Sequence, residues 1–125
     1  MELYRQGGGT GEKNLSMTFS ENLKQLPKVS HLAALQLLDA ADGSLVATIE
    51  NKPGQVGSLI IYNHLGQLFG AITADAAKKG LELYAEHVEE ARASPGKHPN
   101  IDRLLQLLAA PRTLRVKQLF STGLE

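Results

Sequence analysis

The clearest pattern in the chain is an apolar stripe in its second half, between residues 74 and 92. Its apolar positions recur at four-three-four-three spacing, which places them on one face of an α-helix while the charged residues between them face solvent. Thr73 is suited to cap the first turn, and Asp75 lies near the positive end of the helix dipole. We predict one long helix over residues 74–92. Its buried positions are Ala77, Leu81, Tyr84, Val88 and Ala91.

A short helix is predicted close to residue 20. Thr18 and Glu21 have the Ser/Thr-x-x-Glu spacing in which each side chain satisfies the other residue's backbone N–H group. Pro27 stops the run, because proline has no N–H group and its ring clashes with the preceding turn. The expected helix spans about residues 19–26.

The C-terminal part predicts a helix followed by a strand. Asn100 is suited to cap a helix from 101 to about 110, which Pro111 stops and which presents Leu104, Leu105 and Leu108 to a core. Residues 113–120 then alternate in the manner of a half-buried strand. Leu114, Val116 and Phe120 are expected on its inner side, and Arg115, Lys117 and Leu119 on its outer side. The basic outer row suits an edge strand, where charge discourages pairing with other chains.

Two β-hairpins are predicted in the first half. Apolar segments flank Asp42-Gly43, a pair typical of tight hairpin turns, and they predict strands near 33–39 and 45–50. Residues 51–57 contain proline and two glycines and form a loop. The β-branched and aromatic run 59–62 and the segment 68–72 then favour a second hairpin.

The same stretch has a helical alternative. Ser58 is then the cap, and Gly70 lies just past the C-terminal end. The apolar residues at helical spacing are Leu59, Tyr62, Leu65 and Phe69. We favour the strands.

The order of these elements predicts an α+β fold, with an antiparallel sheet of four to five strands, two main helices packed on one face and a short N-terminal helix. The length of 125 residues suits one domain, which we place at 17–122. Residues 1–16 are rich in glycine and are expected to be a flexible tail, as are residues 123–125. Met17 is a candidate for the natural start of translation.

Composition narrows the classes of function. With 13 basic and 13 acidic side chains, the formal net charge is zero, which argues against general nucleic-acid or acidic-membrane binding. The absence of cysteine excludes disulfides, thiolate metal sites and cysteine nucleophiles. Neither a secretion signal nor a membrane-spanning run is found, so we expect a cytoplasmic protein. We assign it no cofactor.

Two loops, 52–58 and 97–100, offer the best candidate chemistry. Each joins a lysine to glycine near the expected start of an element, where exposed N–H groups attract anions. The candidate ligand-binding residues are Lys52, Lys97, His98, Asn100 and Asp102. A metal site built on His87 and Glu90, with Glu86 or His98 added, is a weaker alternative, and we assign no metal ligand and no catalytic residue.

Three segments, NKPGQVGSL at 51–59, GLELYAEH at 80–87 and PGKHPNIDRLL at 95–105, carry a family resemblance. Between Met17 and Ser121 the chain resembles a family of small bacterial proteins known only as a domain of unknown function. That resemblance implies no activity. From the residues themselves we expect a non-enzymatic binding or protein-interaction module, with a homodimer as one form. The alternative is a small enzyme or anion-binding protein that uses the two loops.

Overall fold

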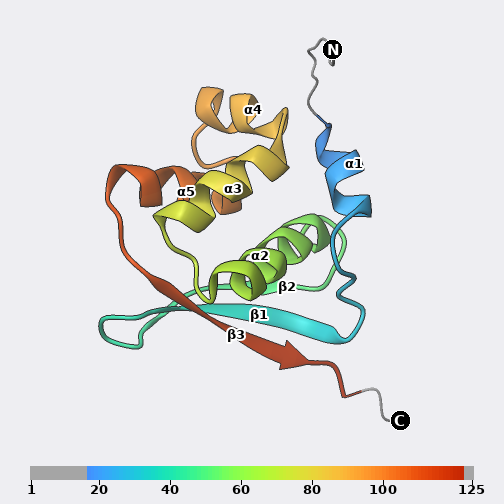
Figure 1. Cartoon of the computed structure of the whole chain (residues 1–125), viewed down its shortest axis with the longest axis vertical. Helices are drawn as coiled ribbons and strands as arrows, with labels where there is room; N and C mark the ends of the chain where they lie inside the picture. Colours follow the sequence, from blue (N-terminus) through green and yellow to red (C-terminus); the bar gives the residue numbers. More distant parts are fainter. Residues whose placement is uncertain (1–16, 123–125) are drawn as a thin grey trace, which may run out of the picture.

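The computed structural model describes residues 17–122, which form a three-stranded antiparallel sheet with five helices on one side of it (Figure 1). This confirms the α+β class and the helices on a single face, but four to five strands were too many. The predicted tails 1–16 and 123–125 lie outside the described residues, and the prediction about the start at Met17 concerns the first of these segments.

The sheet has the order β2-β1-β3. Its central strand β1 (Leu32–Asp39) pairs with β2 (Leu45–Glu50) through the predicted hairpin, whose Gly43 has a φ of 77°. Strand β3 (Leu114–Phe120) returns from the far end of the chain to the other side of β1. It is an edge strand with exposed Arg115 and Lys117, as predicted.

The two missing strands are replaced by helix α2 (Val56–Phe69), so the second hairpin was wrong and its helical alternative was right. Gly70, with a φ of 80°, ends the helix, but the N-cap is Gln55 and not Ser58. Of the predicted inner face, Leu59, Tyr62 and Leu65 are buried, but Phe69 at the end of the helix is exposed. Ile61 and Asn63 are buried as well, because α2 is packed between the sheet and the other helices. A helix covered on several sides has apolar residues around much of its circumference, and its sequence then resembles that of a buried strand.

The predicted long helix is two helices, α3 (Ala74–Tyr84) and α4 (His87–Ala93). The chain breaks at Ala85, whose backbone has φ 52° and ψ −121°. The side chain of Thr73 caps α3 by accepting a hydrogen bond from the Ala76 N–H group at 3.2 Å, as expected. The apolar stripe is also confirmed, since Ala77, Tyr84 and Ala91 are buried and the two others are half-buried.

The remaining helices agree with the predictions in place but not in every detail. Helix α1 (Phe19–Lys24) has the predicted capping box. Helix α5 (Pro99–Ala109) begins two residues earlier than expected, so its N-cap is His98 and not Asn100. The buried face also differs, since α5 packs on α3 with Leu107 buried where Leu108 was expected.

The last strand departs from simple alternation at its end. Its register against β1 shifts between Leu32 and Ala34, a β-bulge that puts Leu32 opposite Phe120. Phe120, the last residue of the strand, has 62% of its surface exposed, although it was predicted to face the core.

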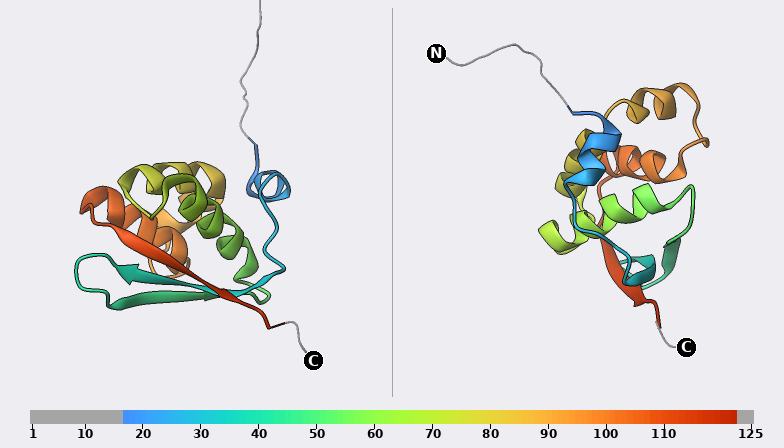
Figure 2. Two further views of the ribbon diagram at one scale, coloured as in Figure 1. Left: turned by 60° about the horizontal axis from the view of Figure 1, so that its bottom comes forward. Right: turned by 90° about the vertical axis from the view of Figure 1, so that its right-hand side faces the viewer.

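The core lies between the sheet and the helix layer, and the opposite face of the sheet is uncovered (Figure 2). Leu35 and Leu37 of β1 are fully buried on the helix side, together with Leu59 and Leu65 of α2 and Leu104 of α5. Within residues 17–122, no helix has the length and apolar character needed to cross a lipid bilayer.

Candidate functional site

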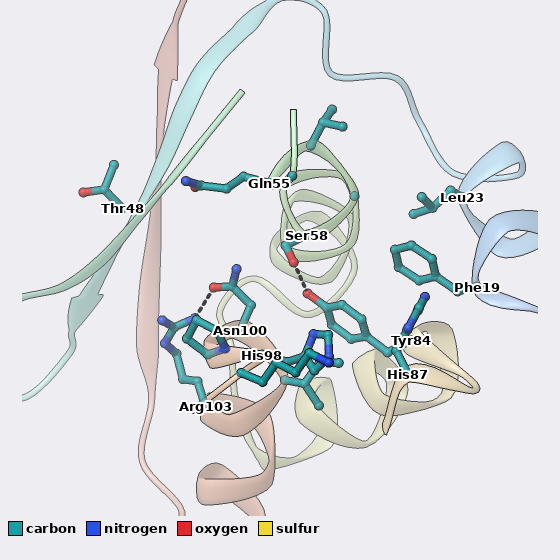
Figure 3. A pocket seen from close by; sticks show the side chains of 16 residues that line it. Phe19, Leu23, Thr48, Gln55, Ser58, Tyr84, His87, His98, Asn100 and Arg103 are labelled. Carbon is teal, nitrogen blue, oxygen red and sulfur yellow. Dashed lines mark hydrogen bonds between the residues drawn. The ribbon is translucent and has the colours of Figure 1, made fainter. Parts of the chain in front are cut away.

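A pocket of about 600 Å³ lies where α1, the first turns of α2 and α5, and the end of α3 meet (Figure 3). Residues 54–58 and 97–101 form much of its wall. Pockets that bind small molecules have volumes of roughly 300–1,000 Å³, so this one has a suitable size. The other side chains around it are Phe19, Leu23, Thr48, Tyr84, His87 and Arg103.

The two loops singled out in the sequence therefore meet at one pocket, which sequence reasoning did not establish. One loop leads from β2 into α2, and the other leads from α4 into α5. The two N-cap residues, Gln55 and His98, form no side-chain capping bond. Instead, the side-chain oxygen of Gln55 accepts a hydrogen bond from the Glu50 N–H group at 2.8 Å. Two helix N-termini without side-chain caps, each at the positive end of its helix dipole, thus border the pocket.

Arg103 is the most informative charged group at this site. One guanidinium nitrogen, Nη1, donates to the hydroxyl of Tyr62 at 3.2 Å and to the side-chain oxygen of Asn100 at 2.8 Å. The guanidinium carbon lies 5.6 Å from the centre of the Tyr62 ring. Within residues 17–122 no carboxylate forms an ion pair with Arg103, so this half-buried positive charge is held in place by neutral groups alone.

The structure brings three of the five predicted site residues together. Lys97, His98 and Asn100 line the pocket. Lys52 does not, since its ammonium group lies 3.2 Å from the Glu50 carboxylate on the surface. Asp102 is turned toward its own loop, where its carboxylate accepts a hydrogen bond from the Gly96 N–H group at 2.8 Å.

Sequence reasoning missed Arg103, Ser58 and the aromatic residues of the pocket. The signal for Arg103 was available: it lies three positions after Asn100 on the predicted helix, and residues three apart share a helix face. Phe19 and Tyr84 offered no such signal, because they come from distant helices that only the fold brings together.

The carboxylate of Glu90 lies close to three nitrogen-bearing side chains at the edge of the pocket. Its carboxylate oxygens lie 2.7 Å from Lys97 Nζ, 3.0 Å from His98 Nε2 and 3.9 Å from His87 Nδ1. His98 Nε2 is shielded from solvent and, apart from this ion-pair contact, has no hydrogen-bonding partner among the described residues. The hydrogen bond from Lys97 is the main cause that lowers the pKa of Glu90, with His98 contributing.

This cluster bears on the metal alternative. His87, Glu90 and His98 do converge, but the Glu90 carboxylate already forms an ion pair with the ammonium group of Lys97. Glu86 is engaged elsewhere, accepting a hydrogen bond from the Phe19 N–H group at 2.9 Å. Among residues 17–122, no group of three or more histidine, aspartate or glutamate side chains is arranged to hold a metal ion.

Two buried tyrosines line or support the pocket as neutral phenols. Burial raises the pKa of Tyr62 to about 12, although Arg103 opposes this shift. Burial also raises the pKa of Tyr84, whose hydroxyl is hydrogen-bonded to Ser58 Oγ. Neither phenol is a base near neutral pH, so the Ser58 hydroxyl has no activating partner in Tyr84. Both hydroxyls serve as hydrogen-bonding groups.

A second hollow, of about 740 Å³, lies on the other side of α1, but its charged groups do not converge on a ligand. Lys79 lies 3.7 Å from Glu82, and Glu86 is bonded to the backbone of Phe19. The pocket at the two helix N-termini is therefore the better candidate.

The chain is thus a small α+β domain with a cationic pocket at the edge of its helix layer. A family model described as an uncharacterized protein conserved in bacteria (DUF2322) matches residues 19–118, and the chain belongs to this family. The matched region contains all of the pocket residues. No curated protein and no solved structure matches the chain.

Proposed function

We propose that this protein binds a small anionic molecule in the pocket between α1, α2 and α5. The observation that carries the proposal is Arg103, a half-buried guanidinium with no carboxylate partner among the described residues. A guanidinium has five N–H donors in a planar fork that matches carboxylate and phosphate groups. In Arg103 the intramolecular bonds use Nη1, which leaves the other nitrogens for a ligand.

The charge of the whole lining supports the same proposal. Lys97 and Arg103 line the pocket together with two histidines, and no aspartate or glutamate is among the lining residues that the structure describes. The Glu90 carboxylate pairs with Lys97 and offsets its charge, so Arg103 is the principal cation of the pocket. The positive ends of two helix dipoles add to its field.

The proposed activity is binding and not catalysis. The hydroxyl nearest the centre of the pocket belongs to Ser58, and its partner is a neutral tyrosine and not a histidine base. The same proposal includes a cytoplasmic location, where anionic metabolites are the natural ligands.

The test is a titration of the labelled protein with sodium acetate, sodium phosphate, benzoate and 2-naphthoate, followed by backbone amide shifts in nuclear magnetic resonance spectra. At least one anion should shift the amides of residues 54–58 and 97–103. Arg103→Gln should weaken that binding by about tenfold to a hundredfold, because a hydrogen bond to a charged group contributes roughly 1.5–3 kcal/mol. Arg115→Gln is the matched control, since Arg115 is exposed on β3. If no anion shifts these amides, or if both variants bind alike, the proposal is wrong.

A second proposed role is self-association through the uncovered face of the sheet. Leu38 lies opposite Leu45 across the hairpin and opposite Arg115 on β3, so this face carries apolar groups beside charge. Leu45 has 57% of its surface exposed and lies beside Leu38, and adjacent exposed apolar groups are a feature of contact surfaces. Size-exclusion chromatography with light scattering should show a dimer that Leu45→Glu converts to a monomer. A wild-type monomer at every concentration would count against this role.

A further inference from the structure

The pocket has two chemically different ends. Arg103 and Asn100 lie at one end, and Phe19, Leu23 and Tyr84 lie at the other, with Ser58 between them (Figure 3). The two ends come from different parts of the fold, since α5 supplies the polar end and α1 and α3 supply much of the apolar one. A small inorganic anion needs only the first of these ends.

The apolar end is built from aromatic rings in a defined arrangement. The rings of Phe19 and Tyr84 are stacked with their centroids 5.7 Å apart and an angle of 7° between their planes. The ring of His87 meets Phe19 edge-on, with centroids 4.7 Å apart. The adjacent side chain of Val56 leaves 39% of its surface exposed at the edge of this pocket. Tyr84 has only 3% of its surface exposed and supports the half-buried Phe19 ring, so Phe19 and Val56 are the apolar surface that another planar ring can cover.

Local packing keeps this end of the pocket in shape. A β-carbon at Gly57 would lie 2.8 Å from the Cζ atom of Phe19, so glycine is needed for the ring to lie against the first turn of α2. Helix α1 is fixed by two bonds to the end of α3 and the residues after it. Glu86 accepts from the Phe19 N–H group at 2.9 Å, and the Asn22 side chain donates to the Leu83 carbonyl at 3.0 Å.

We propose that the ligand is a planar aromatic anion, with its ring system against Phe19 and Val56 and its carboxylate or phosphate group on Arg103. This inference rests on the proposed function, which says that the ligand is an anion, and adds that the anion carries an aromatic ring system. The volume of about 600 Å³ has room for a bicyclic ring and its anionic group. Carboxylate and phosphate share the geometry that a guanidinium fork recognises, so the ring is the part that distinguishes this ligand from inorganic anions.

Three probes separate the contributions of charge and ring. 2-Naphthoate has both, 2-naphthamide has the ring without the charge, and acetate has the charge without the ring. Titrations of the full chain at constant ionic strength, followed by the amide shifts of residues 54–58 and 97–103, should show 2-naphthoate binding at least tenfold more tightly than either of the others. Comparison with 2-naphthyl phosphate then tells whether carboxylate or phosphate is the preferred head group.

Variants locate the ring within the pocket. Phe19→Ala should lower the ratio of naphthoate affinity to acetate affinity by about threefold to tenfold, the size of an aromatic contact. Phe120→Ala is the control, because Phe120 is an exposed ring on β3 and should leave the ratio unchanged. Gly57→Ala, which pushes on Phe19 without removing it, serves as a second variant if Phe19→Ala loses α1.

The outcomes distinguish this inference from the function on which it rests. Equal affinities for naphthoate and acetate, or an unchanged ratio in both pocket variants, would overturn the aromatic ligand while leaving an anion site in place. Equal affinities for naphthoate and naphthamide, or no shift with any anion, would overturn the anion site itself.

Discussion

Replacing Leu104 with alanine should lower the free energy of unfolding by about 2 to 5 kcal/mol, the usual cost of emptying a buried leucine site. Leu104 is fully buried in α5 and packs against α3, where Gly80 allows the two helices to approach closely. Most domains of this size have a total stability of roughly 5–15 kcal/mol, so the loss is a large fraction of it. Urea unfolding followed by circular dichroism measures the change.

The same contact predicts a reversal of sign at Gly80. A β-carbon there would lie 2.7 Å from a methyl carbon of Leu104 and 2.9 Å from one of Leu65. In the wild type, Gly80→Ala should therefore destabilise the protein by about 1 to 2 kcal/mol, because overpacking outweighs the gain of about 1 kcal/mol in helix propensity. In the Leu104→Ala background it should stabilise, because the vacated space receives the methyl group and also lets the Leu65 side chain move away from it. A gain in stability in both backgrounds would contradict this packing, and Lys78→Ala on the exposed face of α3 is the control.

Local sequence signals predicted the elements whose formation depends on neighbours in the chain. The Thr18 capping box, the Asp42-Gly43 turn and the Thr73 cap are each made by a few adjacent residues, and the structure has all three. The position of β3 at the edge of the sheet was also predicted, since its outward row of basic residues requires solvent and not a neighbouring strand. What these features share is that their energetics are decided within one turn or one strand.

The errors arose where packing between elements decided the outcome. Ala85 and Glu86 are strong helix formers, and nothing in their sequence ends a helix, yet the chain breaks there. The break turns α4 toward α5, where it buries Ala91, and it directs Glu86 to the backbone of Phe19. The contact of Glu86 with Phe19 joins residues 67 positions apart, and no local pattern encodes it.

The same division between local features and contacts between elements applies to the candidate site. Two loops with lysine and glycine were correctly expected to precede or border element starts, and the fold joins them. Lys52 lies outside the pocket, with its ammonium group beside the carboxylate of Glu50 at the surface. Whether a charge has a partner depends on side-chain geometry, which is why Arg103 became evident as the principal cation only in the folded chain.

Tyr62→Phe should show how the core supports this cation. The Tyr62 hydroxyl donates to the Asn100 carbonyl and accepts from Arg103, so its removal leaves two polar groups of α5 without these bonds. We expect a loss of about 1 to 3 kcal/mol at pH 7, together with weaker anion binding, because Arg103 loses part of its support. Tyr84→Phe is the control for stability, and it should cost less because the hydroxyl of Ser58 is neutral.

The cost of Tyr62→Phe should also shrink at alkaline pH. Burial raises the pKa of Tyr62 from 10.0 to about 12, so the folded protein keeps the phenolic proton while the unfolded chain releases it. The stabilisation by this tyrosine is therefore complete below pH 10 and is lost as the pH rises from 10 toward 12. Tyr84 titrates in both proteins, and its effect cancels in the difference between them. Urea unfolding at pH 7, 9, 10.5 and 11 should show the gap between wild type and variant narrowing only above pH 10. A gap that stays constant to pH 11 would mean that Tyr62 ionises normally in the folded protein, and that its hydroxyl is open to water.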